Sequence, residues 1–593
     1  MKIACLIKQI PRPDAIEFDQ ETKQIRREGV PLELNAFDSF AVAEAARLRD
    51  EEGGEVIAMT MGPPQAEEAL RECMRLGADR CIHLSDRAFA VADTLGTSRT
   101  LAMAIEKEGC DLVLCGRKTL DSETWQVPPE VAAFLGRPHV TNAVGLALDG
   151  GRLQVRRETD VGEETVELPL PALVSIARTQ HASWDANRQG PIDVWTAGDL
   201  VDDLRENDKR FGQTGSPTRV LAVRDVTPDR ARELAPSPEE GAERVAALLD
   251  ERPRTASAWE KPERLGEKPG KSYDCWSFVE TFGDRPSRTS LELVAKGREL
   301  AGKLGGANVA LVLGHAVGEA AGEVARRGAD ITIVADHEGL RPLVADPWAA
   351  ALRQVVERER PHVLLIPATA RGRDLGPRVA GELELGMTGD CVDLGIDRAG
   401  RLIQYKPAYG GNIVSVIMGA TTPQLATVRP RMFEPLQPNG GEGEARRFQL
   451  DGLPAAAASV LESEPADPTP YTLDEADVIV CAGEAVGAGG IGELEQAAAA
   501  IGAAVGGDRA ACGAGVVPWA RQVGLLGRQV APRLYIAVET SGDFEHTAAS
   551  VKADVILVLK SSDAPVRGTA DVAVAGDWRE TLPRVAEALR SRV

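Results

Sequence analysis

The stretch DLVLCGRKTLDSETWQVPPEVAAFLG, residues 111–136, shows how this chain alternates apolar and polar segments. Its first residues, DLVLC, form a short apolar run that predicts a buried strand. The polar segment GRKTLDSETWQV follows at the carboxyl end of that strand, which is where open α/β sheets bind ligands. The stretch therefore predicts one strand of a parallel sheet with a ligand-binding loop after it.

The same alternation runs through the whole chain. Longer helical segments such as FAVAEAARLRDEE and EEALRECMRLG separate the apolar runs, and this order is typical of βαβ units with a parallel sheet. The runs fall into three groups, namely 3–7, 56–60, 81–84 and 112–115; 309–313, 331–334 and 363–367; and 478–481, 534–538 and 555–559. We therefore expect an α/β protein with three units.

The first two units resemble each other, which indicates an internal duplication. The segment PEVAAFLG at Pro129 is followed 248 positions later (377 − 129) by PRVAGELE at Pro377. Gly-Arg-Leu at Gly151 recurs 249 positions later (400 − 151) at Gly400. Chance likeness between two α/β units is the alternative. We expect two pseudo-equivalent, doubly wound lobes of the nucleotide-binding type.

Two stretches of different composition divide the chain. The segment 256–271 is rich in charged residues, Gly and Pro, and the segment 451–470 is rich in Pro, Ala and acidic residues. Both are therefore predicted to be linkers. The expected domains are residues 1–255, which end in a C-terminal arm, residues 272–450 and residues 471–593.

The composition excludes several classes of protein. The chain has 593 residues, of which 43% are hydrophobic and 27% charged, and these values are typical of globular domains. Its net charge of −22 opposes binding to nucleic acid and to anionic lipid. The nine scattered cysteines predict neither disulfides nor a structural metal. No apolar stretch suits a membrane span or a signal peptide. We expect a soluble, cytoplasmic protein without metal or nucleic-acid partners.

The C-terminal unit carries several glycine-rich turns. The string from Gly487 to Gly492 has the spacing of a dinucleotide fingerprint, although a flexible turn in an Ala- and Gly-rich unit gives the same string. The blocks DRAACGAGVVP (508–518), QVGLLGR (522–528) and TSGDFEH (540–546) add an arginine, backbone amides, a hydroxyl and a histidine. Such groups suit a cofactor with a diphosphate and a ring that gains negative charge on reduction. The alternative is that they are ordinary loop and surface residues.

The first unit has a second candidate site. The segment 93–98 lies at the predicted start of a helix, where free N–H groups hold a phosphate, or where a side chain only caps the helix. The segment 121–126 follows the strand at 112–115 and offers polar side chains to a nucleotide. A doubly wound sheet would bring both segments to one crevice.

Together these blocks resemble those of an electron transfer flavoprotein whose beta and alpha subunits are fused in one chain, beta first. The beta-like blocks are MKIACLIKQIPRP, LNAFDSFAVAEA, ADT, GRKTLDSETWQV and GSPTRV. The alpha-like blocks are SLELVAKGRELA, ATARGRDLGPRVA, KPAYGGNI, ATVRP and the three C-terminal blocks. The resemblance runs nearly end to end.

The resemblance implies a Rossmann-like FAD domain at the C-terminus and a second nucleotide in the beta-like part. The second nucleotide is AMP in simple carriers and FAD in electron-bifurcating ones; the similarity of Asp93-Thr94 and DSETWQV to the bifurcating pattern favours FAD. The residues expected at the C-terminal site are Arg509, Gln522, Val523, Gly524, Gly527, Ser541, Gly542 and His546. The residues expected at the beta site are Asp93, Thr94, Thr97, Gly116, Asp121, Thr124, Gln126 and Val127.

The resemblance also implies roles and shows departures. Arg509 is expected beside the flavin ring, where it would stabilise the reduced, anionic form, and His546 near the pyrimidine oxygen of the ring. Glu484, Leu526 and Leu559 replace residues that the family uses around FAD. In the beta-like part, Val127-Pro128 replaces Val-Gly, and the partner-docking loop is shortened to residues 177–190.

The function implied is that of an electron carrier rather than a substrate-converting enzyme. It would hold one or two FAD and pass electrons between a flavin dehydrogenase, or NADH, and another redox protein. NADH-linked bifurcation and a higher oligomer remain open. One alternative is a nucleotide-binding paralogue with an impaired alpha flavin site and a regulatory or structural role. Another is an NAD-dependent enzyme that uses the glycine fingerprint.

Overall fold

The computed structural model describes residues 1–19, 24–26, 29–160, 162–226, 228–252, 273–283, 285–341, 344–411, 413–438, 443–465, 473, 476–561 and 569–590. The chain forms two compact units. The first contains Met1–Val223, Glu260–Pro407 and Ser415–Ala466; the second contains Arg224–Trp259, Ala408–Val414 and Asp467–Val593.

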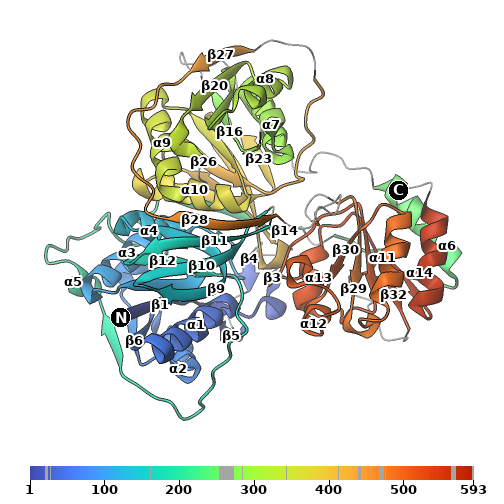
Figure 1. Ribbon diagram of the computed structural model, residues 1–593, viewed down its shortest axis with the longest axis horizontal. Helices are drawn as coiled ribbons and strands as arrows, with labels where there is room; N and C mark the ends of the chain where they lie inside the picture. Colours follow the sequence, from blue (N-terminus) through green and yellow to red (C-terminus); the bar gives the residue numbers. More distant parts are fainter. Residues whose placement is uncertain are drawn as a thin grey trace. The chain divides into compact units, whose positions relative to one another are not determined.

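The first lobe of the first unit is built on a ten-stranded sheet (Figure 1). Its central strand, β1 (Lys2–Leu6), pairs in parallel with β6 (Glu55–Met61) on one side and with β8 (Leu112–Gly116) on the other. Every residue of β8 is buried, as expected for a parallel strand that helices cover on both faces. Further strands of the sheet are β7 (Arg80–Leu84), β13 (Ile192–Trp195), β12 (Ala172–Ile176), β9 (His139–Asp149), β10 (Arg152–Glu158), β11 (Gly162–Pro169) and β28 (Ser459–Pro465). The helices of this lobe are α1 (Ala36–Glu52), α2 (Glu67–Leu76), α3 (Thr94–Glu108), α4 (Val127–Leu135) and α5 (Ala197–Leu200).

The second lobe has a seven-stranded sheet with the same central arrangement. Its first strand, β16 (Cys275–Val279), pairs in parallel with β19 (Asn308–Gly314) and with β21 (Val363–Pro367). The other strands are β20 (Ile331–Asp336), β22 (Met387–Cys391), β26 (Gln424–Val428) and β27 (Glu444–Arg447). The helices are α7 (Arg288–Leu304), α8 (Gly318–Arg326), α9 (Ala345–Glu359) and α10 (Ala370–Glu382).

The two lobes meet through the helices that carry the repeated sequence. Figure 1 shows α4 beside α10, and these helices hold the PEVAAFLG and PRVAGELE segments. Their backbones approach so closely that a Cβ at Gly381 would lie 2.7 Å from the Cβ of Ala133. The α/β class and the two pseudo-equivalent, doubly wound lobes predicted from the sequence are thus confirmed.

Part of one predicted linker is a strand. Residues 451–470 were expected to separate two domains, but Ser459–Pro465 form β28, which pairs antiparallel with β11 at the edge of the first sheet. Ala458 and Val460 add their side chains to the core of the first lobe, which explains why this stretch does not remain a loop. The other predicted linker, 256–271, lies outside the described residues.

The second unit contains a six-stranded parallel sheet. Its strands, in the order in which they pair, are β15 (Glu233–Ala235), β33 (Val572–Ala575), β32 (Val555–Lys560), β31 (Leu534–Val538), β29 (Val478–Ala482) and β30 (Ala504–Gly507). The helices are α6 (Pro238–Glu251), α11 (Ile491–Ala500), α12 (Arg509–Gly513), α13 (Phe544–Ser550) and α14 (Trp578–Leu589). The remaining strands are β2 (Gln9–Pro11), β3 (Glu17–Asp19), β4 (Gln24–Arg26), β5 (Leu32–Leu34), β14 (Thr218–Asp225), β17 (Thr281–Phe282), β18 (Arg285–Pro286), β23 (Asp393–Ile396), β24 (Leu402–Ala408) and β25 (Ile413–Gly419).

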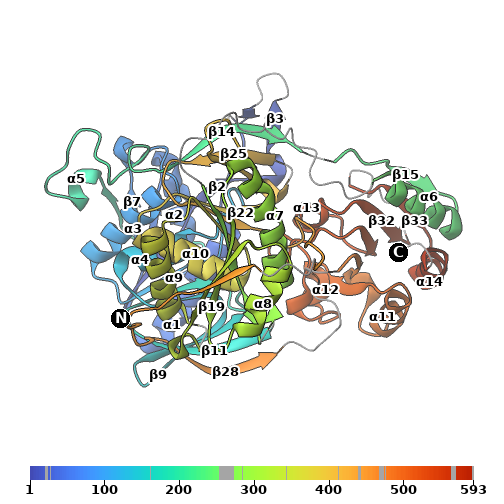
Figure 2. The same ribbon diagram turned by 90° about the horizontal axis from the view of Figure 1, so that it is seen from above.

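The arm at the end of the beta-like sequence belongs to this second unit. Strand β15 pairs with β33, and α6 packs against α14 (Figure 2). Asp571 ties the arm to the sheet, because its fully buried carboxylate accepts hydrogen bonds from Arg230 at 2.7 Å and Arg252 at 2.8 Å. The same carboxylate also accepts the backbone N–H groups of Ala231 and Ile556.

We predict that Asp571→Ala lowers the free energy of unfolding of the second unit by about 3 to 5 kcal/mol, because it leaves the buried Arg230 without its carboxylate. Chemical denaturation followed by circular dichroism measures this change. Glu239→Gln is the matched control. It removes an exposed ion pair with Arg584 between α6 and α14 and should leave the stability unchanged. A loss for Asp571→Ala as small as that of the control would show that apolar contacts alone hold the arm.

Candidate functional site

The first candidate site lies where β1 and β8 end in the first lobe. The sheet continues with β6 and β7 on one side of β1 and with β8 and β12 on the other. The strand order therefore reverses between β1 and β8, which makes this place the topological switch point of the sheet. Lys8, just after β1, donates a hydrogen bond to Asp121 at 2.6 Å. Burial of Asp121 opposes ionisation, but Lys8 and nearby hydroxyl and amide donors hold its pKa below the ordinary value. Asp121 therefore carries a stable negative charge here.

A second group of side chains joins the starts of α3 and α4. The Gln126 amide donates to the Thr94 hydroxyl and to the Glu130 carboxylate, each at 3.1 Å. Thr94 and Ser98 also donate to Glu130, at 3.1 and 2.9 Å. From the second lobe, the Gly389 N–H donates to the Gln126 oxygen at 3.1 Å. The structure thus brings Thr94 and Gln126 together, as the sequence predicts, and connects both lobes at this point.

Glu130 is the residue of this group that the sequence reasoning missed. Its carboxyl group is fully buried, and this burial raises its pKa to about 8. The signal was present, because Glu130 is the one charged residue of the otherwise apolar helix VPPEVAAFL and lies one turn after Gln126.

Between these two groups lies a buried network of charges from both lobes. The Glu123 carboxylate is 3.0 Å from the Lys118 ammonium and 3.3 Å from the Arg429 guanidinium, and Lys406 donates to the Glu123 carbonyl at 3.1 Å. Although burial opposes it, the three cations lower the pKa of Glu123 to about 2. Burial lowers the pKa of Lys118 to about 8.

The loop that carries this network is strained. Glu123 and Trp125 adopt positive φ angles of 46° and 62°, a conformation that is uncommon for side-chain-bearing residues and clusters at functional sites. Two cations lie near the Trp125 ring, with the Arg373 guanidinium 4.1 Å and the Arg117 guanidinium 5.1 Å from its centroid. The second lobe therefore takes part in shaping this loop.

Among the remaining residues predicted for the beta site, Asp93 and Gly116 have structural roles. Asp93 caps α3 by accepting the Gly96 N–H at 3.0 Å, and it also accepts the Thr218 N–H and hydroxyl. Gly116 is needed for close approach, since a Cβ there would lie 2.4 Å from an Asp38 oxygen. Thr97 lies half-buried in the first turn of α3, Thr124 half-buried in the strained loop, and Val127 begins α4.

The second candidate site lies at the carboxyl edge of the six-stranded sheet. Asp508, after β30, caps α12 by accepting the Ala511 N–H at 2.8 Å, and it also accepts the Ser541 N–H at 3.1 Å. Asp543 caps α13 by accepting the His546 N–H at 3.0 Å. Arg509 is exposed at the start of α12. Two helices therefore begin beside each other at this edge.

The loop 522–527 closes this site from the side of β30. Val523 is fully buried and its N–H donates to the Gly507 carbonyl at 2.8 Å. The Gly527 N–H donates to the Gly524 carbonyl at 3.0 Å, which makes the loop a tight turn. Ser541 is exposed, and Gly542 has a φ of 71° that suits glycine. The predicted C-terminal residues thus border one edge of one sheet.

His546 lies in the core beneath this edge. Its Nε2 is 2.7 Å from the Tyr535 hydroxyl and 3.5 Å from the Cys481 thiol. Its Nδ1 is buried and has no hydrogen-bond partner among the described residues. Burial lowers the pKa of His546 below the ordinary value, so the ring is neutral near pH 7. If the Tyr535 hydroxyl donates to Nε2, the proton of the neutral ring lies on Nδ1, which is then a donor that needs an acceptor.

Two family models match this chain. The family model "Electron transfer flavoprotein domain" matches residues 22–200 and 275–453, and "Electron transfer flavoprotein FAD-binding domain" matches residues 472–550. The chain belongs to the electron transfer flavoprotein family. The match over both lobes, followed by the FAD-binding domain, shows a fused chain with its beta-like part first.

Individual relatives match the two parts separately. The chain is 38% identical over 238 residues to the electron transfer flavoprotein subunit beta of Thermoanaerobacterium thermosaccharolyticum, covering 40% of this chain and 92% of that one. It is 35% identical over 323 residues to the subunit alpha of Clostridium acetobutylicum, covering 52% and 95%. It is also 39% identical over 231 residues to the caffeyl-CoA reductase-Etf complex subunit CarD of Acetobacterium woodii, covering 37% and 86%.

The residues of the C-terminal edge fit FAD, the cofactor of this family's domain. The buried Nδ1 of His546 has no hydrogen-bond partner among the described residues and can bond to an atom of the cofactor, and Arg509 offers an exposed cation. Of the departures from the family pattern, Leu559 points into the hydrophobic core and is fully buried, so it does not face the edge. Glu484 is exposed after β29, and Leu526 presents its backbone N–H to Glu545.

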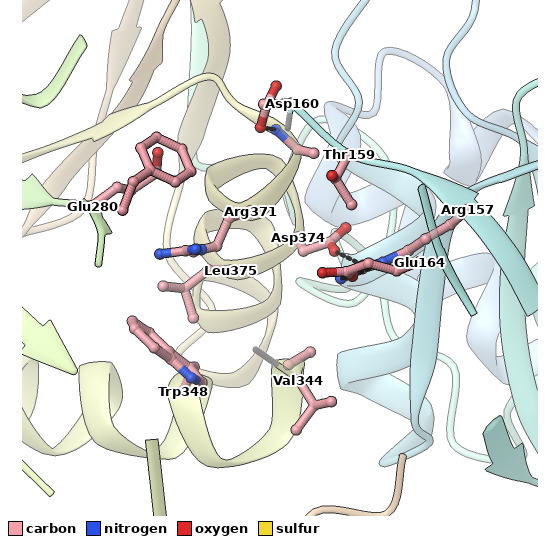
Figure 3. A pocket seen from close by; sticks show the side chains of 13 residues that line it. Arg157, Thr159, Asp160, Glu164, Glu280, Val344, Trp348, Arg371, Asp374 and Leu375 are labelled. Atoms are coloured by element: carbon pink, nitrogen blue, oxygen red, sulfur yellow. Dashed lines mark hydrogen bonds and ion pairs between the residues drawn. The ribbon is translucent and has the colours of Figure 1, made fainter. Parts of the chain in front are cut away.

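A pocket of about 60 Å³ lies elsewhere in the first unit, at the carboxyl ends of β16 and β21 (Figure 3). The Asp160 carboxylate accepts the Ala370 N–H at the start of α10, at 2.7 Å, and so takes the place where an anion would bind. The volume holds only a few water molecules. The second lobe's switch point is thus closed by a side chain of the first lobe.

Within the described residues, no helix is long and apolar enough to span a membrane, and no cluster of His, Cys, Asp and Glu side chains suits a metal ion.

We predict that Glu130→Gln makes the stability of the first unit less dependent on pH. A proton on Glu130 stabilises the fold at low pH, and this contribution is lost as the pH rises from the ordinary value of 4.5 to about 8. The slope is up to about 1.4 kcal/mol per pH unit. Urea denaturation across this range measures it, with the exposed Glu106→Gln as control. Identical slopes for Glu130→Gln and wild type would place the titrating proton on another group.

Proposed function

We propose that this chain carries electrons between a flavin dehydrogenase, or NADH, and another redox protein, with FAD at the C-terminal edge and a second FAD in the first lobe. The observation that supports this most directly is the pairing of two sites in one chain, each at the carboxyl edge of a parallel sheet. A carrier that accepts electrons from one partner and gives them to another has a use for two cofactors. The name of the A. woodii relative points to a reductase as one kind of partner.

The residues of the C-terminal edge would bind and orient the cofactor. FAD supplies the electron-accepting ring when bound. Arg509 would hold a fixed positive charge beside that ring, which favours a reduced ring over an oxidised one. The Nδ1–H of His546 would donate to an oxygen of the ring, and Tyr535, by donating to Nε2, would keep the proton on Nδ1. The loop 522–527 would exclude water from one side.

In the first lobe, the second nucleotide would lie where β1 and β8 end, near Thr94, Asp121 and Gln126. Doubly wound sheets bind nucleotides at this point. We favour FAD over AMP because the Asp93-Thr94 and DSETWQV segments are similar to the bifurcating pattern.

The rival is a nucleotide-binding paralogue with a regulatory or structural role. Glu484, which is exposed beside the C-terminal edge, favours it because a carboxylate repels a diphosphate. The visible spectrum of the purified full-length protein, followed by identification of the nucleotides released on denaturation, separates the two. The carrier shows flavin bands and two FAD per chain, whereas colourless protein that releases only AMP and does not bind added FAD supports the rival.

The same measurement assigns the second nucleotide. Gln126→Ala removes the amide that links Thr94, Glu130 and the second lobe, so we expect it to lose one nucleotide per chain and keep the other. Retention of both nucleotides by this variant would move the second site away from the crevice after β8.

We predict that Arg509→Ala lowers the reduction potential of the C-terminal FAD or weakens its binding, because it removes a cation from beside a ring that gains negative charge. A charge-assisted contact is worth about 1.5 to 3 kcal/mol. A redox titration and the FAD content after gel filtration measure the change. Arg579→Ala, on the exposed side of α14, is the control. Unchanged potential and FAD content would place Arg509 on the surface only.

A further inference from the structure

The carboxyl group of Glu545 lies among the residues expected to hold FAD. It accepts hydrogen bonds from the Leu526 backbone N–H at 3.0 Å and from the Gln522 side chain at 3.4 Å. A Cβ at Gly524 would lie 2.3 Å from the same oxygen. The carboxyl group therefore packs directly against the loop 522–527, which is expected to pass close to the flavin ring.

Charged and titratable groups face Glu545 from several elements. Asp543 lies at the start of the same helix and Asp508 and Arg509 lie at the start of α12. Cys481 of β29 and Tyr535 of β31 also interact with its charge. The loop 522–527 contributes no charged side chain of its own.

The balance of these groups raises the pKa of Glu545. Burial has the largest effect and raises its pKa above the ordinary value, and Asp543 and Asp508 act in the same direction. The Leu526 N–H and Arg509 act in the opposite direction but are outweighed. Glu545 thus holds a proton more readily than an exposed glutamate does.

FAD brings further negative charge to this edge. Its diphosphate is anionic, and its ring gains charge on reduction. A carboxylate that borders the loop beside the ring would repel both, most strongly where burial excludes water. A protonated carboxyl group removes that repulsion, and its carbonyl oxygen can still accept the Leu526 N–H.

We propose that the C-terminal edge takes up FAD together with one proton, which neutralises Glu545. This inference rests on the proposed FAD site and makes Glu545 a positioning residue, since it holds the loop 522–527 through Leu526 and sets the affinity for FAD through its charge.

The test is FAD binding by the full-length protein after removal of its nucleotides. Flavin fluorescence gives the Kd of wild type and of Glu545→Gln between about pH 6 and 9, a range that spans a raised carboxyl pKa. We expect the wild-type Kd to rise by up to tenfold per pH unit where the proton is taken up. Glu545→Gln keeps the oxygen that accepts from Leu526, so its Kd should stay near the low-pH value of wild type. The exposed Glu580→Gln on α14 is the control and should follow wild type.

Calorimetry of wild type in two buffers with different heats of ionisation counts the protons directly and needs no variant. One proton taken up per C-terminal FAD supports the inference. A wild-type Kd that does not change with pH, or a Glu545→Gln protein that keeps the wild-type pH dependence, would refute it while leaving the FAD site in place. If neither protein binds FAD at any pH, both this inference and the C-terminal FAD site are wrong.

Discussion

Parallel pairing of buried strands is the constraint on which the rest of this structure depends. A parallel strand must be covered on both faces, so β1, β8, β16 and β21 are almost wholly apolar and their polar residues are confined to the segments that follow them. Because all the strands of such a sheet run in one direction, those segments gather at one edge. Asp121 and Lys8 meet there in the first lobe, and Asp508 and Ser541 meet there in the second unit. The parallel order of the strands is enough to bring these segments together.

This constraint explains what could be predicted from the sequence. The apolar runs marked the strands, and the helix start predicted at 93–98 is the start of α3 at Thr94. The duplication was visible because α4 and α10 keep similar residues where they touch. The positions of polar side chains at a helix start or just after a strand could therefore be predicted. Thr94 and Gln126 are an example, because the structure brings them into contact.

Contacts between distant segments were not foreseeable in the same way. Glu123 contacts Lys406 and Arg429, and Gln126 contacts Gly389. The partners in these contacts are about 260 to 310 positions apart in the sequence. No local pattern specifies such a pairing, because it depends on how the two lobes are placed. The strand at Ser459–Pro465 was missed for a related reason: its composition is that of a linker, and only the open edge of β11 gives it a partner. The charged residues Glu130 and Glu545 were visible in the sequence, but their burial was not.

The arm formed by β15 and α6 has a consequence for the order in which the chain folds. Arg230 and its partner Asp571 are 341 positions apart, so during synthesis the arm leaves the ribosome long before the sheet that it completes. Domains fold as units while the chain is made, and the first lobe can therefore assemble while the arm still has no sheet to join. The apolar face of α6, with Val245, Leu248 and Leu249, stays without its partner until α14 has been made. The second unit therefore cannot close while α14 is still missing from the growing chain.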